Sequence, residues 1–253
     1  MRFHGASEVA LDESLLSTGL TVLAAVAAGP TGGKVENVGR SYSLETIVQH
    51  SLQGEAAAPT ANALLRWVLS EGPSLSSFEE DDVAAAILAV QPEAGLDAAL
   101  DAYAPDDYLP RSWMLGGNDD DESEDHRPIA AVAPEVLKAW VEHAPLARAP
   151  FAARHVAYFV VIEDRLEWTA LALWLMTRSG AEKAVLDQFA LRFHSGSFNG
   201  GIENRYRKRL ALVERLAGSD NLVIREWAAV TAALLRESIA KEQERERLLS
   251  EQF

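Results

Sequence analysis

The segment SDNLVIREWAAVTAALLRESIAKEQERER, residues 219–247, decides the fold class. Alanine and leucine, which have high helix propensity, dominate its centre, and its apolar residues recur at spacings of three and four. This pattern predicts a long amphipathic helix over 221–248. The alternating charges of the tail KEQERERLLSEQF, residues 241–253, predict that the helix extends into solvent.

The same pattern continues outward along almost the whole chain. A capping box, Ser77-Phe78-Glu79-Glu80, marks one helix start, because the serine hydroxyl and the Glu80 carboxylate each satisfy a backbone N–H at the helix end. Asp81 and Asp82 follow in the first turn, where the helix dipole favours negative charge. In all, helices are predicted over 12–28, 43–53, from Pro59, from Ser77, and over 93–103, 134–143, 148–162, 165–178, 181–193, 202–217 and 221–248.

The stretch HVAYFVVI, residues 155–162, is the one serious candidate for a strand, because it is rich in β-branched and aromatic residues. We interpret it as helix, since its neighbours are helical and no partner strand is visible. The sequence therefore predicts an all-α protein of about ten or eleven helices, either an irregular HEAT-like α-solenoid or a compact helical bundle.

A weak internal echo favours stacked helical units. Glu167-Trp168-Thr169-Ala170-Leu171 resembles Glu226-Trp227-Ala228-Ala229-Val230, and an arginine precedes each segment. The predicted organisation is an acidic N-terminal helical region over 1–104, an acidic irregular loop or hinge over 105–133, and a C-terminal HEAT-like helical region over 134–253.

Composition limits the function classes. The 253 residues include no cysteine, which excludes disulfides, thiolate nucleophiles and cysteine-ligated zinc. No apolar run is long enough to span a bilayer, and the N-terminus does not read as a secretory signal. We expect a cytoplasmic protein that does not bind membranes.

The net charge of −15 is unevenly distributed. Residues 1–126 hold 5 basic and 22 acidic side chains, whereas residues 127–253 hold 18 basic and 16 acidic ones. Repulsion from phosphates disfavours direct nucleic-acid binding, so the predicted partner is a protein with a basic surface. The run NDDDESED, residues 118–125, is predicted to be a solvated loop, and its candidate contact residues are Asp119, Asp120, Asp121 and Glu122.

Motifs for chemistry are missing from the sequence. There is no Walker-type Gly-Lys-Ser/Thr, no HExxH, no histidine pair at helical spacing and no Gly-x-Ser-x-Gly elbow. We therefore predict a non-enzymatic protein with no catalytic residues, metal site or cofactor. Trp113, in the irregular segment, is a candidate partner contact because aromatic residues in loops can anchor partners.

The stretch FHSGSFNGGIENRYRKR, residues 193–209, allows two interpretations. Its glycine-rich loop precedes a helix on which Arg205, Lys208 and Arg209 can share a side, while Arg207 points elsewhere. It is either a phosphate or nucleic-acid site over 194–209, or a structural corner that lets Phe193 and Phe198 pack under the adjoining helices.

From Phe193 to the C-terminus, the chain resembles the C-terminal helical module of bacterial HEAT-like proteins found in antiphage and related conflict systems. A Ser-Gly-Ser loop precedes a helix pair, and the second helix carries Ile224-Arg225-Glu226-Trp227-Ala228 and ends in an Arg/Glu tract. The resemblance implies a scaffold or recognition surface, as in a subunit of a bacterial defence system. An alternative function is an inhibitor or immunity protein whose acidic surface mimics nucleic acid.

Overall fold

The computed structural model describes residues 13–28, 40–70, 77–102, 115, 127–178, 180–194 and 202–250. Contacts divide the chain into two compact units, Met1–Ser112 and Trp113–Phe253, and the division lies within the predicted segment 105–133. Each unit is described by itself below.

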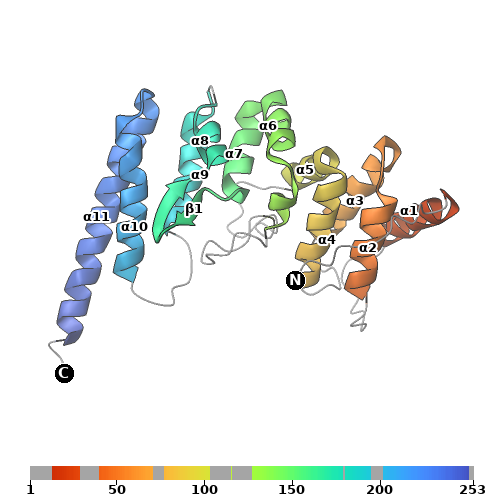
Figure 1. The fold of residues 1–253 in the computed structure, drawn as a ribbon, viewed down its shortest axis with the longest axis horizontal. Coiled ribbons are helices and arrows are strands. Elements are labelled where there is room, and N and C mark those ends of the chain that lie inside the picture. The colour runs from red at the N-terminus through yellow and green to blue at the C-terminus, as the bar shows by residue number, and fades with distance from the viewer. Residues whose placement is uncertain are drawn as a thin grey trace. The chain divides into compact units, whose positions relative to one another are not determined.

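The first unit is a set of packed helices with an apolar core. Helix α1 packs on α2 and α3, α2 packs on α4, and α3 packs on α5 (Figure 1). Leu64, Leu65, Ile87 and Leu88 are fully buried at the centre. The elements are α1 (Glu13–Ala27), α2 (Arg40–Ser51), the 3-10 helix η1 (Glu55–Ala57), α3 (Ala58–Val68), α4 (Ser77–Val90) and α5 (Pro92–Asp101).

Two details fix the helix packing in this unit. A side chain on Gly19 of α1 would place its Cβ 1.9 Å from the Oγ and 2.8 Å from the Cβ of Ser51, so glycine permits the close approach of α1 and α2. At the start of α5, the Gln91 amide donates to the carbonyls of Leu52 and Gly54, at 2.8 Å each. The Gln91 side chain thereby ties the segment after α2 to the junction of α4 and α5.

The second unit combines helices with one β-hairpin. Helix α7 packs on α6, α8 and α9; α9 also packs on α8 and α11, and α10 lies along α11 (Figure 1). Its elements are the 3-10 helix η4 (Pro128–Ala131), α6 (Pro134–His143), α7 (Pro145–His155), β1 (Phe159–Ile162), β2 (Arg165–Trp168), α8 (Ala170–Met176), α9 (Glu182–His194), α10 (Ile202–Glu214), the 3-10 helix η5 (Arg215–Gly218) and α11 (Leu222–Ser250).

The helical interpretation of 155–162 and of the start of 165–178 is wrong. Helix α7 ends at His155, and β1 pairs antiparallel with β2. The turn residues Glu163 and Asp164 both have positive φ, of 48° and 65°, as a two-residue hairpin turn requires. Glu-Asp lacks the Asn-Gly signal of such turns, and this is why the partner strand was missed in the sequence.

The internal echo is not a structural repeat. Glu167 and Trp168 end a strand, and Thr169 caps α8 by accepting a hydrogen bond from the Ala172 N–H, whereas Glu226 and Trp227 lie inside α11. The all-α class is confirmed, with eleven α-helices and one two-stranded sheet in the part of the chain that the structure describes. The choice between solenoid and bundle stays a prediction.

We predict that Gly19→Ala destabilises the first unit. The added Cβ overlaps Ser51, which is 6% exposed and has little room to move. This overpacking should cost about 1–3 kcal/mol, partly offset by the higher helix propensity of alanine. Hydrogen exchange of the α1 and α2 amides measures the effect. Gly218→Ala is the matched control, because a Cβ added there would meet nothing within 4 Å; equal protection in both variants would contradict the prediction.

Candidate protein-interaction surfaces of the second unit

Most basic side chains of the second unit for which contacts are described are paired with carboxylates or with backbone carbonyls. A common arrangement recurs: an arginine donates to a carbonyl at the C-terminal end of a helix and stacks on an aromatic ring. Helix ends leave their last carbonyls without helical partners, and the helix dipole makes this end attractive to a cation. At the end of α6, the Arg148 Nη1 of α7 donates to the Trp140 carbonyl at 2.8 Å, and its guanidinium lies 4.5 Å from the Trp140 ring centroid.

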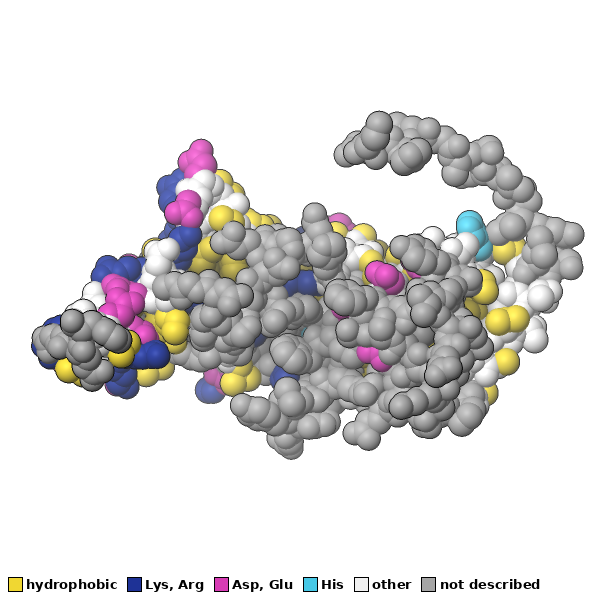
Figure 2. All heavy atoms as spheres, turned by 90° about the horizontal axis from the view of Figure 1, so that it is seen from below, with side chains coloured by type: hydrophobic (Ala, Val, Ile, Leu, Met, Phe, Trp, Pro, Cys, Tyr) yellow, Lys and Arg dark blue, Asp and Glu magenta, His cyan; other side chains and the backbone are white. Residues whose placement is uncertain are grey.

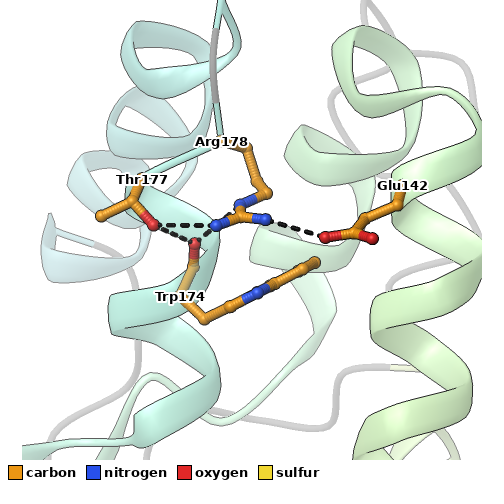
Figure 3. Close-up of polar contacts among 4 residues, drawn as sticks. All are labelled: Glu142, Trp174, Thr177 and Arg178. Carbon is orange, nitrogen blue, oxygen red and sulfur yellow. Dashed lines mark hydrogen bonds and ion pairs between the residues drawn. The ribbon is translucent and has the colours of Figure 1, made fainter.

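Arg178 forms the same arrangement at the end of α8, and Figure 3 shows it bridging to α6. Its Nε donates to the Trp174 carbonyl at 3.1 Å, and its guanidinium lies 4.0 Å from the Trp174 ring centroid. The remaining donors reach the Thr177 hydroxyl at 3.1 Å and Glu142 of α6 at 3.0 Å. Through these contacts, the planar guanidinium of Arg178 connects the end of α8 to α6.

Arg192, on α9, caps α7 from inside the core. It is 6% exposed, and its Nη1 donates to the carbonyls of Ala153 at 3.0 Å and Val156 at 2.6 Å. Its guanidinium lies 4.4 Å from the ring centroid of Tyr158, the residue before β1. Arg192 therefore connects α9, the end of α7 and the entry to the hairpin.

Arg209, a predicted contact residue, caps α9 and is 1% exposed. It donates to the Phe193 carbonyl, and its guanidinium lies 5.8 Å from the Phe193 ring centroid. Arg209 is thus a core residue, not part of an accessible face with Arg205 and Lys208. Phe193 is fully buried, as the structural-corner interpretation expects, whereas Phe198 and the loop 195–201 lie outside the described residues.

The other basic residues of α10 are also placed by the structure. Lys208 pairs with Asp164 of the hairpin turn. The Arg207 Nε donates to Glu203 at 2.7 Å. That hydrogen bond, followed by one from Gln243 of α11 at 2.8 Å, lowers the pKa of Glu203. Arg205 is half-buried and makes interactions of its own. Helix geometry thus disperses the basic cluster into separate pairs.

An aromatic cluster fixes the hairpin to the helices. Tyr158 lies 6.1 Å from Trp168, 5.9 Å from Phe189 and 5.3 Å from Phe193, measured between ring centroids, and Trp227 of α11 lies 6.1 Å from Phe193. The Trp168 Nε1 also donates to the Leu212 carbonyl of α10 at 2.9 Å. A hairpin that would be marginal alone is therefore held by its β2 side.

Helix α11 has two apolar faces. Ile224, Ala228, Leu235 and Ile239 are buried against the unit. A second row, Val223, Val230 and Leu234, is 42%, 61% and 47% exposed, and we name these three residues the α11 stripe. Their spacing of seven and four residues places them on one line along the helix.

The distal part of α11, from Glu237 onward, carries many charged side chains. Lys241–Glu237, Arg245–Glu242 and Arg247–Glu244 pair along the helix, and Figure 2 shows acidic and basic side chains intermixed at the left end of the view. Such exposed pairs contribute little stability each but keep this segment solvated. This segment also exposes Leu248 and Leu249, at 47% and 48%, whereas the row of three exposed apolar residues lies in the first half of α11.

Trp113 and the predicted acidic contact residues lie outside the described residues. The acidic residues are Asp119, Asp120, Asp121 and Glu122, and the roles assigned to all five stay predictions. In the first unit, burial and then the Asp82 charge raise the pKa of Asp81 to about 6. The described residues contain no group of three or more His, Asp or Glu side chains placed to hold a metal ion.

None of the helices in the described part of the chain has the length and apolarity needed to cross a membrane. Comparison with known proteins found no matching protein-family model, no similar curated protein and no similar solved structure.

We predict that Arg209→Ala destabilises the second unit by about 2–4 kcal/mol, because it removes a buried side chain and leaves the Phe193 carbonyl without this donor. Arg207→Ala, which removes an exposed ion pair, should cost less than about 1 kcal/mol. Urea unfolding followed by circular dichroism compares the two variants. A surface role for Arg209 would instead leave both variants as stable as the wild type.

We also predict that His155 makes stability depend on pH. Burial first, and then the charges of Arg154, Arg192 and Arg127, lower its pKa from 6.5 to about 3. The unfolded chain therefore binds a proton below pH 6.5 that the folded chain excludes until about pH 3, so stability present above pH 6.5 is lost as the pH falls through this window.

The loss between pH 7 and pH 5 should be about 2 kcal/mol larger in the wild type than in His155→Leu, which cannot titrate. Urea unfolding at both pH values measures the difference, and the exposed His143→Leu serves as the control. Parallel pH profiles for wild type and His155→Leu would rule out this role.

Proposed function

We propose that the chain is a helical protein-binding module whose partner packs on the first half of α11. The observation that supports this function is the α11 stripe, because a helix at the end of a packed unit needs only one apolar face for its own fold. A second apolar row in line suits docking by another helix, whose side chains at spacings of three and four reach into such a surface.

The chemistry of the stripe favours an amphipathic helix with basic flanking residues. Glu226 is exposed and lies three residues after Val223, along one edge of the stripe. Opposite charge at this rim would steer association and set orientation. A basic partner also agrees with the acidic balance of residues 1–126.

The resemblance to HEAT-like modules supports the same proposal, since stacked helices each cover a face that the neighbour leaves exposed. On this view the chain is a non-enzymatic scaffold or adaptor, and its place in a bacterial defence system is part of the proposal. Inhibition by the acidic run 118–125 and anion binding over 194–209 depend on residues outside the described ranges and stay alternatives.

We predict that Val230→Lys/Leu234→Lys weakens partner binding by about 10–100-fold, because two apolar contacts at the centre of the surface are lost. Affinity capture from native-host lysate, quantified by mass spectrometry for wild type and variant, identifies partners that depend on the stripe. Titration of each purified partner by calorimetry then gives the affinity change.

Leu249→Lys is the matched control, because Leu249 is 48% exposed on the same helix but lies outside the stripe. It should bind as the wild type does, and both variants should show unchanged circular dichroism. If the wild type and the stripe variant retain the same proteins at low salt, the proposal is wrong.

A further inference from the structure

The outer edge of β1 presents backbone groups that the hairpin does not use. Neighbouring residue pairs of an antiparallel ladder alternate between hydrogen-bonded and non-hydrogen-bonded. The Thr169 N–H donates to the Tyr158 carbonyl at 3.1 Å, and the two-residue turn joins Ile162 to Arg165. Tyr158 and Ile162 therefore face β2, and the intervening Phe159 and Val161 direct their N–H and C=O groups to the opposite side.

This edge is open with respect to the described residues. Within the described ranges, β1 pairs with β2 alone, and no backbone hydrogen bond from the Phe159 or Val161 N–H is found. The β2 side is different, because it packs on α10 and Trp168 donates to that helix. The hairpin is thus fixed along one strand and available along the other.

The sequence of β1 lacks the usual protection of a strand edge. Natural edges carry lysine, proline or a bulge that prevents pairing with another strand. Phe-Val-Val-Ile has none of these, and the Val161 and Ile162 residues are 40% and 45% exposed. An apolar, unprotected edge on an otherwise helical unit indicates a surface that another chain covers.

We propose that β1 binds an extended segment of a partner protein by β-strand addition. An extended chain is the ligand that satisfies alternate N–H and C=O groups along an edge, and β-branched side chains would pack on Val161 and Ile162. Glu163 and Asp164 of the turn already pair with Arg165 and Lys208, so recognition along this edge rests on main-chain hydrogen bonds and apolar side chains.

The length of the edge favours a peptide segment over a second copy of this chain. Four strand residues extend about 13 Å. Such an edge buries much less than the roughly 800 Å² per partner of a stable protein dimer. This surface adds to the proposed function and is independent of the α11 stripe.

The test uses a displayed library of random peptides of about ten residues, long enough to span the edge, selected on the full chain. Enriched peptides should share alternating β-branched residues. A synthetic copy of the tightest peptide is then N-methylated one residue at a time. Methylation at alternate residues should weaken binding at least about tenfold, because only alternate N–H groups donate to the edge.

Val161→Pro removes the outward N–H while leaving the pairing to β2 intact, since proline is tolerated where an edge N–H faces solvent. It should weaken peptide binding about tenfold in fluorescence anisotropy, whereas Val161→Thr, which keeps the N–H, should change it less than about twofold. If Val161→Pro does not fold, Ile162→Lys replaces it, with the equally exposed Leu249→Lys as control.

Four results would overturn the inference: no enriched sequence, equal weakening at every methylated position, equal affinity of the Pro and Thr variants, or a wild-type dimer in sedimentation that Val161→Pro converts to monomer. The last result would assign the edge to a second copy. Val230→Lys/Leu234→Lys should still bind the selected peptide, so failure of the α11 surface and failure of the β1 edge give different outcomes.

Discussion

The second unit depends on arginines that neutralise helix C-termini while lying against aromatic rings. Arg148, Arg178, Arg192 and Arg209 cap α6, α8, α7 and α9 in turn, and each guanidinium is within 6 Å of an aromatic centroid. One side chain thereby satisfies orphan carbonyls, complements the helix dipole and packs on an apolar surface. Because Arg178 contacts Glu142, 36 residues away, and Arg192 contacts Ala153, 39 residues away, the arrangement also orders short helices that would be marginal in isolation.

Because these arginines bind carbonyl groups of the protein itself, the larger number of basic residues in the C-terminal half does not indicate an anion-binding surface. The basic residues of the C-terminal half look in sequence like an anion site, yet those with described contacts are mostly committed to carbonyls or carboxylates. The exposed apolar side chains of this unit include the α11 stripe and Val161 and Ile162 of β1. The function that we propose accordingly relies on hydrophobic packing and main-chain hydrogen bonds rather than on recognition of phosphate.

Some elements follow directly from local sequence. Helix α6 begins at Pro134 and ends at His143 as predicted, and α11 begins within one residue of its predicted start. In both helices, apolar residues recur at helical spacing, and this local pattern is sufficient to predict a helix. The hairpin could not be predicted in this way, because both residues of its turn, Glu163 and Asp164, adopt positive φ angles. Glycine and asparagine are the residues whose presence usually indicates such a turn. The stability of the hairpin comes from Trp168, Phe189 and Phe193, whose proximity no local pattern shows.

The sequence by itself determined the helical class, the positions of most helices and the acidic balance, because propensity, periodicity and charge act over a few neighbouring residues. Only the tertiary structure decided which charges are buried. Arg205, Lys208 and Arg209 are close on a helical wheel, yet Arg209 enters the core, and Lys208 pairs with a hairpin turn 44 residues earlier. Burial depends on neighbours brought from elsewhere in the chain, and that same packing leaves apolar side chains of α11 and β1 exposed.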